Sequence, residues 1–310
     1  MKKMLALTLI FIAVPSFFIL IDYKEEKKYE IKEEKIENNN DITIKVKQTN
    51  KNKIIELNIE DYVKGVIAGE MPISFELEAL KAQAVAARTY ALRRINKNNT
   101  YDVVDTVMNQ VYKDDETLRQ SWGTNYEKYM DKITTAVKET KGEYVDYKGT
   151  YADTLFFSTS VGNTENSEEI FGTKVSYLQS VSSEWDAEVS PVFEEKNIFT
   201  RESFCKKLNL IDCSKIYVSI LDETSTGRIK KIKINNKTFT GSDVAYYLGV
   251  RSNYFNIYIE NNNVVVTTKG YGHGVGMSQY GAEGMATNGY TYKEILEHYY
   301  QGTTIKNLYV

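Results

Sequence analysis

One acid in an apolar setting is the first residue of this sequence that could do chemistry. Glu70 lies in the stretch VIAGEMPISF, with a glycine before it and a proline two positions after it. Apolar surroundings disfavour the charged carboxylate, so they raise its pKa and keep it protonated nearer to neutral pH. A carboxylic acid of this kind suits the role of a general acid. Because a glutamate near a helix end is usually solvated, this prediction depends on Glu70 being buried.

Two cations follow Glu70 on a predicted helix. Lys81 and Arg88 are seven residues apart and fall on the same stripe as the leucines and several alanines of that helix. Their stems can lie on apolar surface while the charged heads reach water, or a polar cleft can cross this face of the helix. Coming directly after an isolated acid, the pair favours the cleft. Gln83 lies elsewhere on the helical wheel and is compatible with the surface.

A glycine-rich loop is the third candidate. Residues 269–286 read KGYGHGVGMSQYGAEGMA, and the alternating glycines allow the backbone to approach a ligand. The spacing does not match a dinucleotide fingerprint and there is no Walker lysine, which argues against a nucleotide site. His273 lies between the glycines and is a candidate site residue. His298 lies on a C-terminal helix that a Thr291 to Glu294 capping box opens, and it is expected to pack in the core.

The elements that must position these residues are short helices and hairpins. Alternating apolar residues over 42–46 and 55–59 predict a β-hairpin. Asp61 can cap a short helix that Pro72 ends, and a longer helix is expected over residues 75–95. Further along, the pattern predicts a helix over 121–140 and strands over 143–147 and 154–158. Because helices and strands do not alternate as regular βαβ units, the predicted class is α+β.

The N-terminal residues predict a membrane anchor. Lys2 and Lys3 precede residues 4–21, which carry no charge and would form about 27 Å of helix, enough to cross a bilayer core. No small-residue cleavage site follows, so we expect residues 1–21 to be a cytoplasmic tip and an uncleaved anchor. The positive-inside rule places the N-terminus in the cytoplasm and the rest outside. Residues 22–40 are rich in Lys, Glu and Asn and read as a solvated stalk.

The folded domain is expected to span residues 41–310. Within it, residues 184–262 change to strands with polar turns, which indicates an inserted β-rich subdomain. Cys205 and Cys213 also lie there. A disulfide is compatible with a location outside the cytoplasm, but two separate buried thiols are the preferred interpretation.

The composition excludes some classes of function. The chain has 310 residues, 42% of them hydrophobic and 26% charged, which is enough to bury a sizeable core. A net charge of -3 and the lack of a long basic run argue against nucleic-acid binding. The two histidines are far apart and no cysteine lies near either, so no metal and no cofactor are expected. Most of the 24 tyrosines are expected to pack, although a tyrosine also offers a sugar a stacking face and a hydroxyl.

Three long motifs occur in order along the chain: EDYVKGVIAGEMPISFELEALKAQAVAARTYAL, FFSTSVGNTENSEEIFG and GYGHGVGMSQYGAEGMA. Together they resemble the stage II sporulation protein D (SpoIID/LytB) family from about residue 41 to the C-terminus, apart from the variable stretch 184–262. The resemblance implies mixed helices and antiparallel strands around a substrate groove.

The activity that the resemblance implies is lytic transglycosylation. Such an enzyme cleaves the N-acetylmuramic acid to N-acetylglucosamine bond of peptidoglycan strands without stem peptides and leaves 1,6-anhydro ends. The resemblance also implies engulfment during endospore formation, an amidase partner, a membrane scaffold partner and a catalytic domain outside the mother cell's engulfing membrane. A lone acid agrees with this chemistry, because hydrolysing a glycoside ordinarily needs two carboxylates.

The catalytic acid of the family falls on Glu70. The substrate-binding positions that the resemblance implies are Lys81, Gln83, Arg88, Tyr90, Ser158, Ser160, Tyr271, His273, Ser278, Gln279 and Tyr280. Members that bind zinc have cysteines and histidines in the segment equivalent to residues 160–169. That segment contains neither here, so no structural zinc is expected.

Two other functions remain open at this stage. One is a glycan-binding amidase activator without catalysis, as LytB-type relatives are thought to be. The other is a retaining hydrolase in which Glu76, Glu78 or Glu165 supplies a second carboxylate. The sequence also leaves open whether Arg88 or Lys81 tunes the pKa of Glu70.

Overall fold

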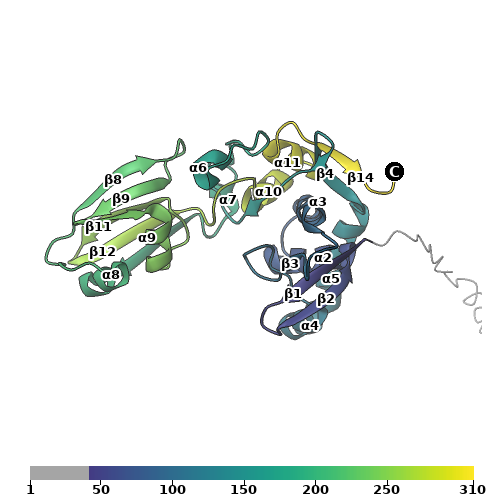
Figure 1. Cartoon of the computed structure of the whole chain (residues 1–310), viewed down its shortest axis with the longest axis horizontal. Coiled ribbons are helices and arrows are strands. Elements are labelled where there is room, and N and C mark those ends of the chain that lie inside the picture. Colours follow the sequence, from purple (N-terminus) through teal and green to yellow (C-terminus); the bar gives the residue numbers. More distant parts are fainter. Residues whose placement is uncertain (1–41) are drawn as a thin grey trace, which may run out of the picture. The chain divides into compact units, whose positions relative to one another are not determined.

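A β-hairpin begins the part of the chain that the structure describes. The structure is a computed structural model, and it describes residues 42–310 (Figure 1). Strand β1 (Thr43–Gln48) pairs antiparallel with β2 (Lys53–Asn58), which confirms the predicted hairpin. The short strand β3 (Val103–Val104) adds to the other side of β1 in parallel.

Helix α2 (Ile59–Glu70) follows the hairpin and carries Glu70 at its last position. Its cap is Asn58, whose side-chain oxygen accepts a hydrogen bond from the Glu60 backbone, so the expectation that Asp61 caps the helix was wrong. The two polar residues are close in sequence, but Asn58 ends strand β2 with the extended backbone that a cap requires. The helix ends where predicted, because Pro72 has no backbone N–H to continue it.

Two glycines give α2 a close neighbour. A Cβ atom at Gly69 would lie 2.3 Å from the carbonyl oxygen of Val111, and one at Gly65 would lie 2.3 Å from the ring of Tyr112. The residues are four apart and therefore share one face of the helix. Only glycine allows the segment around Val111 to approach this face of α2 next to Glu70.

Helix α3 (Leu77–Arg94) is the central element, and it is buried along its whole length from Ala79 to Leu92. Figure 1 shows it end-on, with α2 and α5 on one side and α10 and α11 on the other, and all four pack against it. A helix that is covered all round needs no polar face. Its many alanines let these neighbours come close.

The remaining elements complete this layer of helices and short sheets. Before the β-rich segment they are α4 (Asp115–Trp122), η1 (Gly123–Asn125), α5 (Tyr126–Glu139), β4 (Glu143–Tyr147), β5 (Thr150–Tyr151), β6 (Phe156–Phe157), α6 (Ser167–Phe171) and α7 (Asp186–Val189). After it they are β13 (Met277–Ser278), α10 (Gln279–Thr287), α11 (Tyr292–Tyr299) and β14 (Thr304–Asn307). The helix expected over 121–140 is α5, which begins later, at Tyr126, because Gly123 ends the preceding helix α4 with a positive φ of 52°. The capping box from Thr291 to Glu294 is confirmed.

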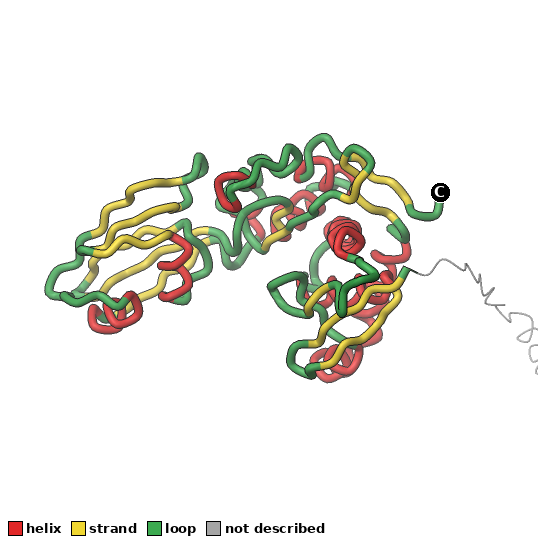
Figure 2. The backbone as a smooth tube through the Cα atoms, in the orientation of Figure 1, coloured by secondary structure: helices red, strands yellow, loops and turns green. Residues whose placement is uncertain are grey.

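The β-rich segment has a core of its own. Its elements are β7 (Glu194–Phe199), α8 (Arg201–Leu208), β8 (Val218–Glu223), β9 (Ile229–Ile234), β10 (Lys237–Thr240), α9 (Gly241–Leu248), β11 (Phe255–Glu260) and β12 (Asn263–Lys269). They form two antiparallel sheets, ordered β10-β9-β8 and β11-β12-β7 (Figure 2). Phe204, Ile232 and Val264 are among the residues of this second core. The exact limits of the subdomain stay a prediction.

The described residues confirm the α+β class, since helices and mainly antiparallel strands are both present. Residues 42–310 form one compact unit. No helix within these residues is both long and apolar enough to cross a membrane. The predicted anchor and stalk, residues 1–21 and 22–40, lie outside the described residues.

A disulfide joins Cys205 and Cys213, so the interpretation as two separate thiols was wrong. Cys205 lies on α8 and Cys213 in the loop after it, with their Cα atoms 6.3 Å apart. The chain reverses at Asn209, which ends α8 in the left-handed conformation. This reversal brings the two cysteines together, and the spacing of eight residues did not reveal it.

Candidate active site

A cavity of about 510 Å³ lies where six parts of the chain meet. The end of α2, the helix α3, the loop after β3, the strand β6, the end of α6 and the glycine-rich segment 269–286 all contribute to it. The lining residues are Glu70, Tyr90, Val107, Met108, Asn109, Leu155, Phe156, Phe157, Ser158, Phe171, Tyr271, Gly272, His273 and Gln279. Among these lining residues, Glu70 is the only acid.

Glu70 is half-buried, and burial raises the pKa of its carboxyl group. Two interactions oppose this shift. The Val111 backbone N–H donates to Oε1 at 2.6 Å, and the side chain of Gln279 also lowers the pKa of Glu70. Burial is the largest of the three effects, so the acid holds its proton to a higher pH than an exposed glutamate. The predicted burial of Glu70 is therefore present in the structure.

Gln279 faces Glu70 from the start of α10. It is 6% exposed, and its Nε2 makes no hydrogen bond of good geometry with any described residue. Both side chains line the cavity, and the Gln279 amide lowers the pKa of the Glu70 carboxyl. An underused donor beside an acid is available to a ligand that enters the cavity.

The loop after β3 is held firmly against the cavity. Asn109 donates from Nδ2 to the hydroxyl oxygen of Tyr90 at 3.1 Å, and its Oδ1 accepts from the Val104 backbone at 2.9 Å. Next to it, the buried Gln110 accepts a hydrogen bond from the hydroxyl of Tyr62. These bonds fix the backbone that places the Val111 N–H on Glu70.

His273 forms part of the cavity wall in its neutral state. Burial and, to a smaller extent, the charge of Arg228 lower the pKa of its imidazole to about 4, although a hydrogen bond with the Phe156 backbone acts in the opposite direction. Its Nδ1 accepts from the Val275 N–H at 3.0 Å, and its ring lies 5.6 Å from the rings of Phe157 and Phe171. The imidazole is therefore held in the cavity wall by the Val275 N–H and the two aromatic rings.

A buried ion pair supports the glycine-rich loop from behind. Arg228 and Glu165 are both fully buried, and Nε of the arginine lies 3.1 Å from Oε1 of the glutamate. Nη1 of Arg228 also donates to the Gly272 carbonyl oxygen at 2.8 Å. The Glu165 N–H donates to the Gly274 carbonyl oxygen at 2.8 Å. The pair therefore ties the loop that carries His273 to the start of β9.

Six of the predicted site residues meet at the cavity, and six do not line it. Those at the cavity are Glu70, Tyr90, Ser158, Tyr271, His273 and Gln279. Those elsewhere are Lys81, Gln83, Arg88, Ser160, Ser278 and Tyr280. The roles assigned to all of them stay predictions.

The cations of α3 have partners away from the cavity. Lys81 Nζ lies 2.6 Å from carboxylate oxygens of both Glu78 and Glu139. Arg88 is fully buried, pairs with Glu60 and donates to the Glu143 carbonyl oxygen. The structure therefore explains both cations by ion pairs, where the sequence had favoured a polar cleft.

The other four are Gln83, Ser160, Ser278 and Tyr280. Ser160 and Ser278 are buried and both donate to the carboxylate of Asp186. Tyr280 packs its ring edge-on against Phe75. Gln83 is fully buried instead of lying at the surface, and neither end of its amide makes a hydrogen bond within residues 42–310.

Comparison with known proteins places this chain in a family. The family model described as stage II sporulation protein, SpoIID, matches residues 47–147. Stage II sporulation protein D of Bacillus subtilis (strain 168) is 42% identical over 271 residues, which is 85% of this chain and 79% of that protein. The chain belongs to the stage II sporulation protein D family. The protein of the same name from Bacillus amyloliquefaciens is 39% identical over 85% of the chain and 78% of its own length. A protein named amidase enhancer, from Bacillus subtilis (strain 168), is 30% identical over 78% of this chain and 40% of its own length.

This member of the SpoIID family has lining residues that the sequence did not reveal. Val107 and Met108 are 86% and 80% exposed at the cavity, although both are apolar. Asn109 and Phe171 also line it. The only signal in the sequence was the apolar pair Val107 and Met108 inside an otherwise polar loop. A single sequence does not show that this loop lies near Glu70.

No group of three or more His, Cys, Asp or Glu side chains that could hold a metal ion occurs among residues 42–310. The expectation of no structural zinc stays a prediction.

Proposed function

We propose that this SpoIID family protein is a lytic transglycosylase that cleaves peptidoglycan strands lacking stem peptides during engulfment. The observation that carries the proposal is a single carboxyl group, Glu70, that lines a cavity and whose pKa is raised by burial. One carboxyl group is enough for an enzyme that uses a hydroxyl of its own substrate in place of water.

The proposed reaction moves one proton through Glu70. The protonated carboxyl donates to the oxygen that joins C1 of N-acetylmuramic acid to N-acetylglucosamine, and the bond from C1 to this oxygen breaks. The ionised carboxylate then takes the proton from the C6 hydroxyl of the same muramic residue as its oxygen bonds to C1. The products are a 1,6-anhydro end and a free hydroxyl on N-acetylglucosamine, and Glu70 is protonated again.

The other lining residues suit a saccharide. Tyr90, Asn109 and Ser158 bring hydroxyl and amide groups to the cavity, whereas Phe157 and Phe171 supply aromatic surface. Cavities that bind ligands typically combine apolar walls with a few polar groups of fixed position.

The placement of other acids argues against a retaining hydrolase. Glu165 is buried in its ion pair with Arg228, and Glu78 pairs with Lys81. Glu76 is exposed, and none of these three lines the cavity. A second carboxylate about 5 Å from the first would be required beside the substrate.

A glycan-binding amidase activator is the second candidate, and the relative named amidase enhancer favours it. In that case the cavity binds a denuded strand and Glu70 transfers no proton. We further propose that residues 4–21 anchor the protein in the mother cell's engulfing membrane with the N-terminus in the cytoplasm. An amidase and a membrane scaffold are the proposed partners.

Product analysis tests the proposed function directly. Purified protein is incubated with denuded glycan strands, and the fragments are identified by mass spectrometry. We expect 1,6-anhydro ends. Reducing ends, heavier by one water, would indicate a hydrolase, whereas bound but intact strands would indicate the activator.

The pH dependence provides a second prediction, through Gln279. Since its amide lowers the pKa of Glu70, Gln279→Leu should raise that pKa further. The protonated acid is the active form, so activity is lost as the pH rises through this pKa. The alkaline limb of kcat/KM against pH should therefore move to higher pH in the variant, which a pH series on denuded strands measures. An unchanged or lower limb would contradict the contact between Gln279 and Glu70.

A further inference from the structure

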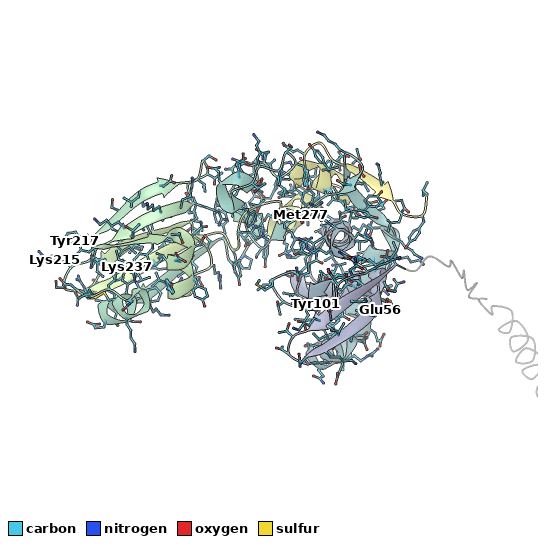
Figure 3. The ribbon with its side chains drawn as sticks, in the orientation of Figure 1. Glu56, Tyr101, Lys215, Tyr217, Lys237 and Met277 are labelled. Carbon is cyan, nitrogen blue, oxygen red and sulfur yellow. A yellow bond between two sulfur atoms is a disulfide. The ribbon has the colours of Figure 1, made fainter. Side chains whose placement is uncertain are left out.

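A second and larger cavity lies in the β-rich segment, outside the site described above. It measures about 980 Å³. It is lined by the loop after α8, the start of β8 and the turn between β9 and β10, with residues Asn209, Leu210, Ile211, Asp212, Ser214, Lys215, Tyr217, Val218, Ser219, Lys233, Asn235, Asn236 and Lys237. Figure 3 shows Lys215, Tyr217 and Lys237 close together at one end of this segment.

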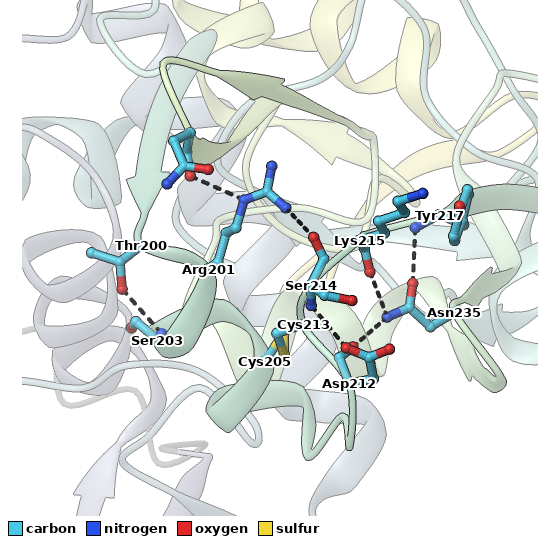
Figure 4. The surroundings of a disulfide bond; sticks show 11 residues. Thr200, Arg201, Ser203, Cys205, Asp212, Cys213, Ser214, Lys215, Tyr217 and Asn235 are labelled. Atoms are coloured by element: carbon cyan, nitrogen blue, oxygen red, sulfur yellow. Dashed lines mark hydrogen bonds between the residues drawn. A yellow bond between two sulfur atoms is a disulfide. The ribbon is translucent and has the colours of Figure 1, made fainter.

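The main wall of this cavity is fixed by covalent and hydrogen bonds. The disulfide from Cys205 to Cys213 ties the loop to α8. The side chain of Asn235 donates to the Asp212 and Lys215 carbonyl oxygens at 2.8 and 3.1 Å and accepts from the Tyr217 N–H at 2.8 Å (Figure 4).

From the other side, Arg201 Nη1 donates to the Ser214 carbonyl oxygen at 2.9 Å (Figure 4). A loop held at this many points is pre-organised, so a ligand that binds to it loses little free energy in ordering the wall.

The cavity carries an excess of positive charge. Its lining has three lysines, Lys215, Lys233 and Lys237, against one acid, Asp212, which gives a net charge of 3 - 1 = +2. A hydrogen bond from the Ser214 N–H lowers the pKa of Asp212, so this acid is already satisfied by its own loop. Lys215 and Lys233 are exposed and form no ion pair with any residue of the described part. Both are therefore available to an anionic ligand.

The cavity also offers a stacking surface. Tyr217 is 65% exposed, although it is aromatic. The side chains of Asn209, Asn236 and Ser219 add hydrogen-bonding groups around it. An aromatic face with amides and hydroxyls beside it matches the two sides of a sugar ring, one of C–H groups and one of hydroxyls.

We propose that this lysine-lined cavity is a second binding site for glycan strands that carry free carboxylates. The proposal rests on the proposed function for the strand, because removal of a stem peptide leaves a lactyl carboxylate on each muramic residue. The lysines pair with these carboxylates, and Tyr217 stacks against a sugar ring. The site retains a long strand on the protein and takes no part in the chemistry at Glu70.

The test measures strand binding in a background that cannot turn the strand over. Full-length protein carrying Glu70→Gln is titrated into fluorescently labelled denuded strands, and anisotropy gives the affinity. The additional change Lys215→Glu with Lys233→Glu should weaken binding about tenfold, because two attractions become repulsions of exposed charges. Tyr217→Ala should weaken binding about fivefold through lost stacking. Neutral chitin oligosaccharides have no carboxylates. They should therefore bind with the same weak affinity to the Glu70→Gln protein with and without the two lysine changes.

A matched pair of lysines provides the control. Lys128 and Lys138 are exposed on α5 and line neither cavity, so Lys128→Glu with Lys138→Glu makes the same charge change elsewhere. If this control variant loses as much strand affinity as the Lys215 and Lys233 variant, the loss comes from net charge alone. The proposed binding site would then be wrong. The proposal would also be overturned if strand affinity stayed unchanged in the double lysine variant and in Tyr217→Ala.

Failure of this proposal and failure of the proposed function give different results. Binding is measured without turnover, so it is independent of whether wild-type protein forms anhydro ends. With Glu70 restored, the Lys215 and Lys233 double variant should cleave short fragments at the wild-type rate, while its KM for long strands should rise about tenfold by the same charge argument. A loss of kcat on short fragments would show that the cavity acts through the catalytic site and would contradict separate strand retention.

Discussion

Glu70→Gln is expected to abolish the formation of 1,6-anhydro ends. General acid and base catalysis contributes about a hundredfold to ten-thousandfold to a rate, and here one residue serves in both steps. We therefore expect a loss near the upper end, about ten-thousandfold. Glutamine keeps the size of the side chain, and its amide oxygen can still accept from the Val111 N–H. It cannot donate a proton to the glycosidic oxygen.

A matched control separates this loss from a general effect of neutralising an acid. Glu283 on α10 is also half-buried and burial also raises its pKa, but it accepts from the Glu76 N–H and does not line the cavity. Glu283→Gln should keep near-wild-type product formation. The melting temperature and strand binding of Glu70→Gln should match the wild type. Anhydro ends at the wild-type rate in Glu70→Gln would mean that another group is the acid.

Arg228→Ala is expected to cost about 3 to 5 kcal/mol in the free energy of unfolding, because it leaves the carboxylate of Glu165 buried without its partner. Both side chains are fully buried, and Arg228 also donates to Asn253 and to the Gly272 carbonyl oxygen. Denaturant unfolding of the full chain measures the change. The tie between β9 and the glycine-rich loop should weaken at the same time, so strand cleavage should fall as well.

An exposed ion pair provides the comparison for this variant. Arg119 pairs with Asp115 and Glu127, and its side chain is 55% exposed. Arg119→Ala should cost far less than Arg228→Ala, because water solvates the remaining carboxylates. If Arg228→Ala costs no more than Arg119→Ala, the pair does not hold the loop as described. Replacing both Arg228 and Glu165 by methionine should recover part of the lost stability.

Local signals in the sequence predicted local structure well. The hairpin, strand β4 and the capping box of α11 follow from alternation, apolar pattern and cap residues, and the structure confirms them. The predicted cap of α2 was wrong by three residues. Asn58 and Asp61 are both good cap residues, and Asn58 caps the helix because the hairpin ends there. The disulfide was missed because it depends on the reversal at Asn209.

The candidate site was predictable where it rests on sequence neighbours and not where it rests on distant contacts. Apolar neighbours indicated the burial of Glu70, but the loop that covers it lies 41 residues along the chain. The helical wheel gave the wrong prediction of a polar cleft at Lys81 and Arg88. It assumes that one face of the helix lies in water, whereas α3 is enclosed on all sides. Glu60, the partner of Arg88, and Glu139, one of two partners of Lys81, come from other helices, while the second partner of Lys81 is Glu78 of α3 itself.

The glycine-lined face of α2 has a consequence for how this protein can vary in evolution. The donor that holds Glu70 is a main-chain group, so exchanging the side chain at position 111 leaves it in place unless proline enters. Changes of the side chain at position 111 are therefore tolerated, whereas an insertion or deletion in the loop would move the amide away from the carboxyl. Homologues should accordingly conserve the length of the loop between Val104 and Val111 more strictly than the residue type at position 111.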